Sequence, residues 1–120
     1  MVGDVHAKAW MLAGVEAFLG AHDVDHVVVL GDYVDDWHAT GRESLECLDA
    51  VVAWARADAR VHLLVGNHDM AYYYQDPSCS GYNRAAAHEL GAAFRHARGL
   101  LFAAVSLDGW LFTHAGVCGR

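Results

Sequence analysis

The sequence predicts an α/β fold with a parallel sheet whose carboxyl edge carries polar side chains. Two short apolar runs, residues 26–30 and 61–65, are rich in Val and Leu and fit strands that are buried on both faces. Between them, residues 43–57 repeat apolar side chains at helical spacing. Glycine and polar residues follow each run, and in open α/β sheets such strand ends meet at one edge and form sites.

The N-terminal third supplies the elements before the second helix. Residues 8–19 place apolar side chains at three- and four-residue steps, which predicts an amphipathic helix that Gly20 ends. Met1 and Val2 are all that precede the first polar cluster, so only a short piece of strand is expected there. The expected order is strand, helix, strand, helix, strand.

The C-terminal third predicts a loop, a helix and a hairpin. Residues 76–81 contain the single proline of the chain and read as a loop, with Tyr72–Tyr74 before it as candidates to line a cleft. Asn83 is placed to cap a helix that reaches at least Leu90. The dipeptide at 108–109 is Asp-Gly, which favours a tight turn, so residues 100–107 and 110–113 are expected to pair. We expect core positions for three tryptophans: Trp10, Trp54 and Trp110.

Composition and charge narrow the class of protein. A length of 120 residues and a hydrophobic content of 55% predict a single domain over residues 1–120. The net charge of −7, without a basic stripe, argues against nucleic acid or an anionic membrane as a partner. The three cysteines show no paired spacing, and no apolar run approaches the roughly 20 residues that span a bilayer. No signal-like stretch opens the chain, so a cytoplasmic location is expected.

Four polar clusters begin where apolar strands stop. They are Asp4 with His6, Asp32 with Asp35, Asn67 with His68, and His114. Oxygen ligands from Asp and Asn combined with imidazole nitrogens suit Mn, Fe or Zn better than Ca or Mg. Two such ions sharing a bridging carboxylate would relieve the repulsion among the carboxylates and generate a hydroxide nucleophile near neutral pH. The same residue types also end strands through turn chemistry alone, which is the structural alternative.

The residue types in these clusters, and their order along the chain, resemble the motifs of a known family. The motifs Gly3-Asp4-Val5-His6, Gly31-Asp32-Tyr33-Val34-Asp35, Gly66-Asn67-His68-Asp69 and His114-Ala115-Gly116 are similar, in type and order, to those of the calcineurin-like metallophosphoesterases. The similarity extends from residue 3 to residue 117 and is nearest to the branch of phosphoprotein serine/threonine phosphatases and diadenosine tetraphosphatases. The implied fold is a partial metallophosphoesterase β-sandwich flanked by helices, with the metal site at the carboxyl ends of the strands.

The resemblance implies a role for each motif residue. Asp4 and His6 would bind a first metal, Asp32 would bridge two metals, Asn67 and His114 would bind the second, His68 would be the general acid and Asp35 would orient it. The implied cofactors are two divalent ions, with Mn, Fe or Zn favoured. The implied reaction is hydrolysis of a phosphate ester, which is a phosphomonoester, a phosphoprotein or a nucleoside polyphosphate.

The sequence also departs from the pattern of this branch. Asp36-Trp37 stands where the branch has Arg-Gly, and Met70-Ala71-Tyr72 follows the third motif without the expected arginine. A guanidinium recognises a phosphate dianion through paired hydrogen bonds, so we expect Arg42, in the loop before the second helix, to substitute.

The ends of the sequence differ from the family as well. Only two residues precede the first motif, and a further metal-binding histidine expected after the fourth motif is absent, so the chain resembles a phosphoesterase that is shortened at both ends, above all at the C-terminal side. These departures leave open an alternative, a catalytically impaired module that keeps the fold and binds metal or a phosphorylated ligand. A nuclease-like phosphodiesterase is disfavoured by the net charge of −7.

Overall fold

A computed structural model describes residues 1–116, while residues 117–120, which include Cys118, lie outside the description. In chain order the described elements are α1 (Trp10–Ala21), β1 (Val27–Val29), α2 (Gly41–Ala57), β2 (Val61–Leu64), α3 (Asn67–Tyr74), α4 (Ala87–Ala97), β3 (Leu101–Phe102), β4 (Ala104–Leu107) and β5 (Trp110–Thr113). The predicted α/β class is confirmed. No described helix has the length and apolar content needed to cross a membrane.

The main sheet is parallel and has the order β1-β2-β3. Val27 is in register with Val61, and Leu63 is in register with Leu101. Val2 extends the sheet beyond β1, because its N–H donates to Val28 O at 2.8 Å and its carbonyl accepts Leu30 N–H at 2.9 Å. The strand piece expected before the first motif is therefore a single parallel bridge, which places the first motif at the same sheet edge as the second.

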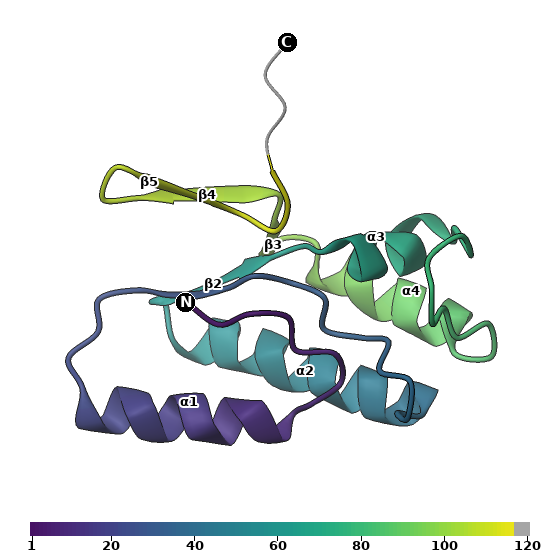
Figure 1. Cartoon of the computed structure of the whole chain (residues 1–120), viewed down its shortest axis with the longest axis horizontal. Coiled ribbons are helices and arrows are strands. Elements are labelled where there is room, and N and C mark those ends of the chain that lie inside the picture. Colours follow the sequence, from purple (N-terminus) through teal and green to yellow (C-terminus); the bar gives the residue numbers. More distant parts are fainter. Residues whose placement is uncertain (117–120) are drawn as a thin grey trace, which may run out of the picture.

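The core lies between this sheet and its helices. Val29 and Leu63 are fully buried, and they share one apolar cluster with Leu48 of α2 and Phe94 of α4. A capping box starts α2, since Thr40 accepts the N–H of Glu43 while the Glu43 carboxylate accepts the N–H of Thr40. In Figure 1, α1 and α2 lie on one side of the sheet and the β4–β5 hairpin extends on the other. The loop after β1 and the start of α3 thus lie together at the carboxyl ends of the strands.

Two local expectations were wrong. Residues 100–107 are not one strand, because a bend at Ala103 separates β3, which pairs with β2, from β4, which pairs with β5. The tyrosines lie in α3, and Tyr73 and Tyr74, but not the buried Tyr72, line a cavity of about 240 Å³. Trp10 and Trp110 are 74% and 72% exposed and do not lie in the core. An apolar residue type permits burial but does not require it.

Asn83 lies a few residues before the start of α4 and is not its N-cap residue. Helix α4 begins at Ala87, and Asn83 Oδ1 accepts the N–H groups of Ala85 and Ala86 at 3.1 Å in the turn before it. The side chain therefore satisfies free backbone donors at the helix entrance, as a cap does, without being the first flanking residue.

Candidate active site

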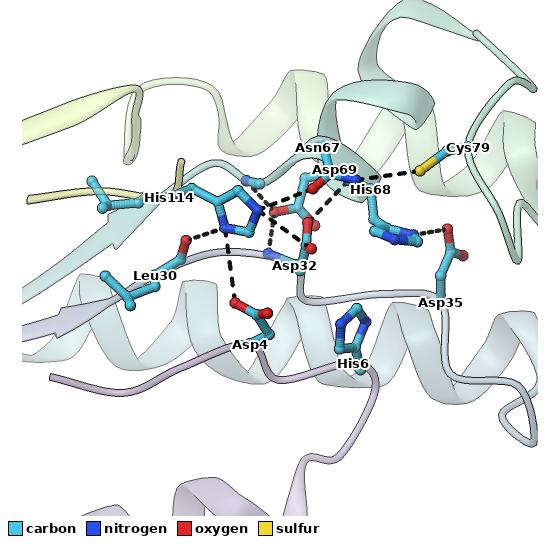
Figure 2. A network of polar contacts seen from close by, with 12 residues as sticks. Asp4, His6, Leu30, Asp32, Asp35, Asn67, His68, Asp69, Cys79 and His114 are labelled. Carbon is cyan, nitrogen blue, oxygen red and sulfur yellow. Dashed lines mark hydrogen bonds and ion pairs between the residues drawn. The ribbon is translucent and has the colours of Figure 1, made fainter. Parts of the chain in front are cut away.

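Two loops at the carboxyl ends of β1 and β2 form the base of the site. The first adopts left-handed backbone at Gly31 (φ 104°), Asp32 (φ 50°) and Asp35 (φ 64°). It packs directly on the second, since a Cβ on Gly31 would lie 2.5 Å from the Gly66 nitrogen. Only glycine permits this approach of the two backbones. As a result Asp32, Asn67 and His68 lie next to one another (Figure 2).

The buried carboxylate of Asp69 joins these two loops through hydrogen bonds. It accepts three backbone N–H groups, from Asp32 and Gly66 at 2.8 Å and from Tyr33 at 2.9 Å. Burial raises the pKa of Asp69 to about 7, while the N–H donors of Gly66 and Tyr33 act in the opposite direction. Sequence reasoning assigned Asp69 no role; its position three residues after Gly66, where an acidic side chain can bond back to a helix entrance, was the available signal.

Three of the predicted ligands converge on one point. The ligand atoms of Asp4, His6 and Asp32 all lie within 4.8 Å of one another. His6 Nδ1 lies 3.0 Å from the carbonyl of Val34, so an Nδ1–H donates there and Nε2 is left with a lone pair. The side chain of Asp4 is 50% exposed, which gives the group an open side. Two carboxylates and one imidazole lone pair match the donor set of Mn, Fe or Zn.

His114, which directly follows β5, lies beside the same group. Its Nδ1 lies 2.8 Å from Leu30 O, and its Nε2 lies 3.0 Å from Asn67 Oδ1 and 3.4 Å from Asp32 Oδ2. An Nδ1–H that donates to Leu30 O leaves the Nε2 lone pair directed at the Asn67 and Asp32 side chains, which is the arrangement of an imidazole that ligates a cation. The residues present fit a bound cation at this point.

His68 and Asp35 form a second group beside the first. His68 Nδ1 lies 3.0 Å from Asp35 Oδ2, and the Asp35 side chain is only 1% exposed. Tyr72 donates its hydroxyl proton to the other carboxylate oxygen at 2.5 Å and accepts the N–H of Asn83 at 2.6 Å. Burial, and then the neighbouring Asp35, raise the pKa of Tyr72 well above its ordinary value, so its hydroxyl remains a donor. Asp35 is thereby fixed in place to orient the imidazole of His68.

The two groups are physically joined. The backbone N–H of His68 donates to Asp32 Oδ1 at 3.0 Å, and the rings of His6 and His68 lie edge to face with centroids 5.3 Å apart. The structure thus brings together all seven motif residues for which the sequence predicted a role: Asp4, His6, Asp32, Asp35, Asn67, His68 and His114. Their individual roles remain predictions.

Comparison with known families agrees with this arrangement. The model of the calcineurin-like phosphoesterase family matches residues 1–117, almost the whole chain. The chain belongs to the calcineurin-like phosphoesterases. No curated protein and no solved structure matches the sequence. Membership supports metal-dependent phosphate-ester chemistry in general. The family match does not separately support the branch of serine/threonine phosphatases and diadenosine tetraphosphatases that the motifs favour.

Two basic residues of this calcineurin-like phosphoesterase, Arg42 and Lys8, lie differently relative to the cavity beside His68. Arg42 is exposed on α2 and donates to Glu46 at 2.8 Å, and it does not line the cavity beside His68. That cavity, of about 270 Å³, is lined instead by Lys8, whose ammonium group lies 2.5 Å from Asp36 Oδ2. Residue pattern did not single out Lys8, because its partner Asp36 is 28 residues away in the chain. Substrate binding by Arg42 remains a prediction.

Proposed function

We propose that this chain hydrolyses a phosphate ester at a centre of two divalent metal ions, with His68 as the general acid. The proposed metal ligands are the five side chains predicted from the motifs: Asp4, His6, Asp32, Asn67 and His114. One observation carries the proposal: the His68 backbone donates to Asp32 Oδ1 while its ring bonds to Asp35, so a proton donor adjoins a carboxylate of the cation group. When bound, the metal ions would supply Lewis acidity and an activated water near neutral pH.

The protein's own part in the reaction is to deliver a proton. Asp35 accepts the Nδ1–H of His68, which directs a proton on Nε2 away from Asp35. As the P–O bond of the ester breaks, this proton passes to the departing oxygen, and the negative charge of Asp35 stabilises the imidazolium beforehand. Tyr72 keeps Asp35 in this orientation through its own hydrogen bond.

The substrate within the phosphate-ester class is a finer proposal. Lys8 is the basic residue lining the cavity beside His68, and Asp36 already pairs with it. A doubly charged phosphoserine on a protein surface is typically held by a free guanidinium. We therefore favour a small phosphomonoester over a nucleoside polyphosphate or a phosphoprotein. The pairing of Lys8 with Asp36 also favours the alternative, a module that binds metal or a phosphorylated ligand without hydrolysing it.

Hydrolysis assays with Mn²⁺ test the enzyme proposal. We expect His68→Ala to lower kcat by about 10²- to 10⁴-fold, the usual contribution of a general acid. The loss should be larger for an alkyl phosphate than for 4-nitrophenyl phosphate, because nitrophenolate leaves without protonation. Asp32→Asn should also lower the amount of Mn²⁺ bound per chain, as measured by elemental analysis. His88→Ala, on the exposed face of α4, is the matched control.

Two results separate the candidates. Equal rates for the wild type, His68→Ala and Asp32→Asn would overturn the enzyme proposal. Metal binding at one ion or fewer per chain, together with no turnover of either ester, would favour the binding module instead.

A further inference from the structure

A tryptophan stands at the cavity that His68 shares. Trp37 belongs to the loop between β1 and α2 and lines the same cavity as His68 and Asp35. Its side chain is 81% exposed, although most large aromatic side chains lose much of their surface on folding. A single exposed aromatic residue is ordinary, but one at the rim of a cavity beside a proton donor is placed to contact what enters.

Asp36 holds the loop in shape around this tryptophan. Its Oδ1 accepts the N–H of His38 at 2.9 Å, its carbonyl accepts the N–H of Ala39 at 3.2 Å, and its Oδ2 pairs with Lys8. Trp37 is therefore flanked on both sides by residues in a hydrogen-bonded turn. The backbone that carries the indole is therefore held in one conformation before any ligand binds, which reduces the entropy lost on binding.

The charges around the cavity indicate what kind of group fits. The carboxylates of Asp35 and Asp36 are matched by His68 and Lys8 respectively. The remaining lining consists of Trp37, of His6, whose Nε2 lone pair belongs to the cation group, and of Ser80 and Gly81, which carry no charge. No cation is therefore left over among the described lining residues to hold a second anionic group. An uncharged group with a flat face meets these conditions best, because it can stack on the indole and leave both pairs intact.

We propose that Trp37 forms a subsite for a flat, uncharged aromatic ring in the leaving group of the substrate. The inference rests on the proposed function, in which His68 protonates the departing oxygen, so the leaving group must occupy the cavity that lies beside His68. The ring then stacks on Trp37 while the phosphoryl group faces the cation group at Asp32. The subsite selects for an aryl or nucleoside phosphate over an aliphatic one.

A specificity ratio tests the subsite. We expect Trp37→Ala to lower the ratio of kcat/KM for phenyl phosphate over glycerol 2-phosphate about tenfold, mostly through KM, since stacking on an aromatic side chain contributes about that much. Trp37→Phe should restore most of the ratio. Trp110→Ala, which removes another exposed indole on β5, is the control and should leave the ratio unchanged. Adenosine 5′-monophosphate as a third substrate shows whether a nucleoside or a simple aryl group benefits more.

A binding measurement keeps the subsite testable even without turnover. Phenylphosphonate, which cannot be hydrolysed in this way, should quench part of the tryptophan fluorescence of the wild type and of Trp110→Phe, but not of Trp37→Phe. Equal changes of kcat/KM for the ring-bearing and aliphatic esters in Trp37→Ala, or equal quenching in all three proteins, would overturn the subsite. Absence of hydrolysis with Trp37-dependent quenching would instead overturn the proposed function and leave the subsite standing.

Discussion

The two edges of the main sheet hold their carboxylates in different ways. At the amino edge, before β2, Asp58 pairs with the guanidinium of Arg60, with Oδ2 2.7 Å from Nη2 and Oδ1 3.0 Å from Nε. At the carboxyl edge, Asp32 and Asp69 accept hydrogen bonds from backbone N–H groups, and Asp35 accepts from His68 and Tyr72. The carboxylate at the amino edge is thus paired with a cationic side chain, whereas the carboxylates at the carboxyl edge are held mainly by neutral hydrogen-bond donors.

This difference fits the position of the group of possible metal ligands found among the described residues, which lies at the carboxyl edge. A guanidinium cancels the charge of Asp58 within the chain. Neutral N–H donors fix the direction of a carboxylate but leave its net charge in place. Lys8 is the basic residue that the described part of the chain brings near the carboxyl edge, and it pairs with Asp36 rather than with Asp4 or Asp32. The remaining negative charge at this edge is available to ions from solution.

The largest effect should come from the carboxylate that ties the two loops together. Asp69→Ala leaves three buried N–H groups, of Asp32, Tyr33 and Gly66, without an acceptor, so we expect a loss of at least about 3 kcal/mol in the free energy of unfolding. Urea unfolding followed by circular dichroism measures it. Asp76→Ala removes an exposed carboxylate–backbone bond and should cost less than about 1 kcal/mol. Equal losses would show that burial at the carboxyl edge is irrelevant.

The close packing of the loops can be broken with a single methyl group. A Cβ on Gly66 would collide with Asp32 Oδ1 and lie 2.5 Å from the Asp32 nitrogen, whereas a Cβ on Gly3 meets nothing within 4 Å. We expect Gly66→Ala to cost about 1–3 kcal/mol and Gly3→Ala to stay within about 0.5 kcal/mol. Thermal unfolding of both variants decides this, and a Gly66→Ala protein as stable as the wild type would contradict the packing.

The frame of this site was predictable because local pattern determined it. Residues 27–29 and 61–64 form strands at the predicted positions, since continuous apolar runs of this length suit a sheet covered on both faces. The polar motifs then follow at the strand ends by geometry alone. Helix α3 was missed, because its eight residues carry no clear amphipathic repeat and its start depends on the bond between Asp69 and Gly66.

The residues that support the site could not be predicted in the same way. Tyr72 bonds to Asp35 across 37 positions in the chain, and Lys8 reaches Asp36 across 28. Such pairs depend on how the loops pack in three dimensions, which residue type and spacing do not reveal. The exposure of Trp37 is equally a matter of loop shape, because the same residue type at Trp54 packs partly against the core.

A metal-binding measurement tests whether Asp4, on the exposed side of the carboxyl edge, is a ligand. Without metal, in EDTA, Asp4→Asn should change the free energy of unfolding by less than about 0.5 kcal/mol, because Asp4 is half exposed. With free Mn²⁺ at ten times its Kd, the wild type should gain about 1.4 kcal/mol and the variant much less. Thermal unfolding with and without Mn²⁺ measures both terms, with Asp49→Asn on the exposed face of α2 as the control. An undiminished gain in Asp4→Asn would exclude Asp4 as a ligand.

The smallest effect belongs to the amino edge and depends on pH. The hydrogen bond from Arg60 lowers the pKa of Asp58 from 3.8 to about 2. A folded-state pKa below the unfolded one stabilises the protein above the unfolded value, and this contribution is lost as pH falls through the folded value. The wild type should therefore be slightly more stable than Asp58→Asn at pH 6, and the difference should shrink from about pH 4 downward. Thermal unfolding of both proteins from pH 6 to pH 3 measures the difference. Because Arg60 already neutralises Asp58, Mn²⁺ should leave the difference unchanged; a Mn²⁺-dependent difference would mean that the two edges are not distinct.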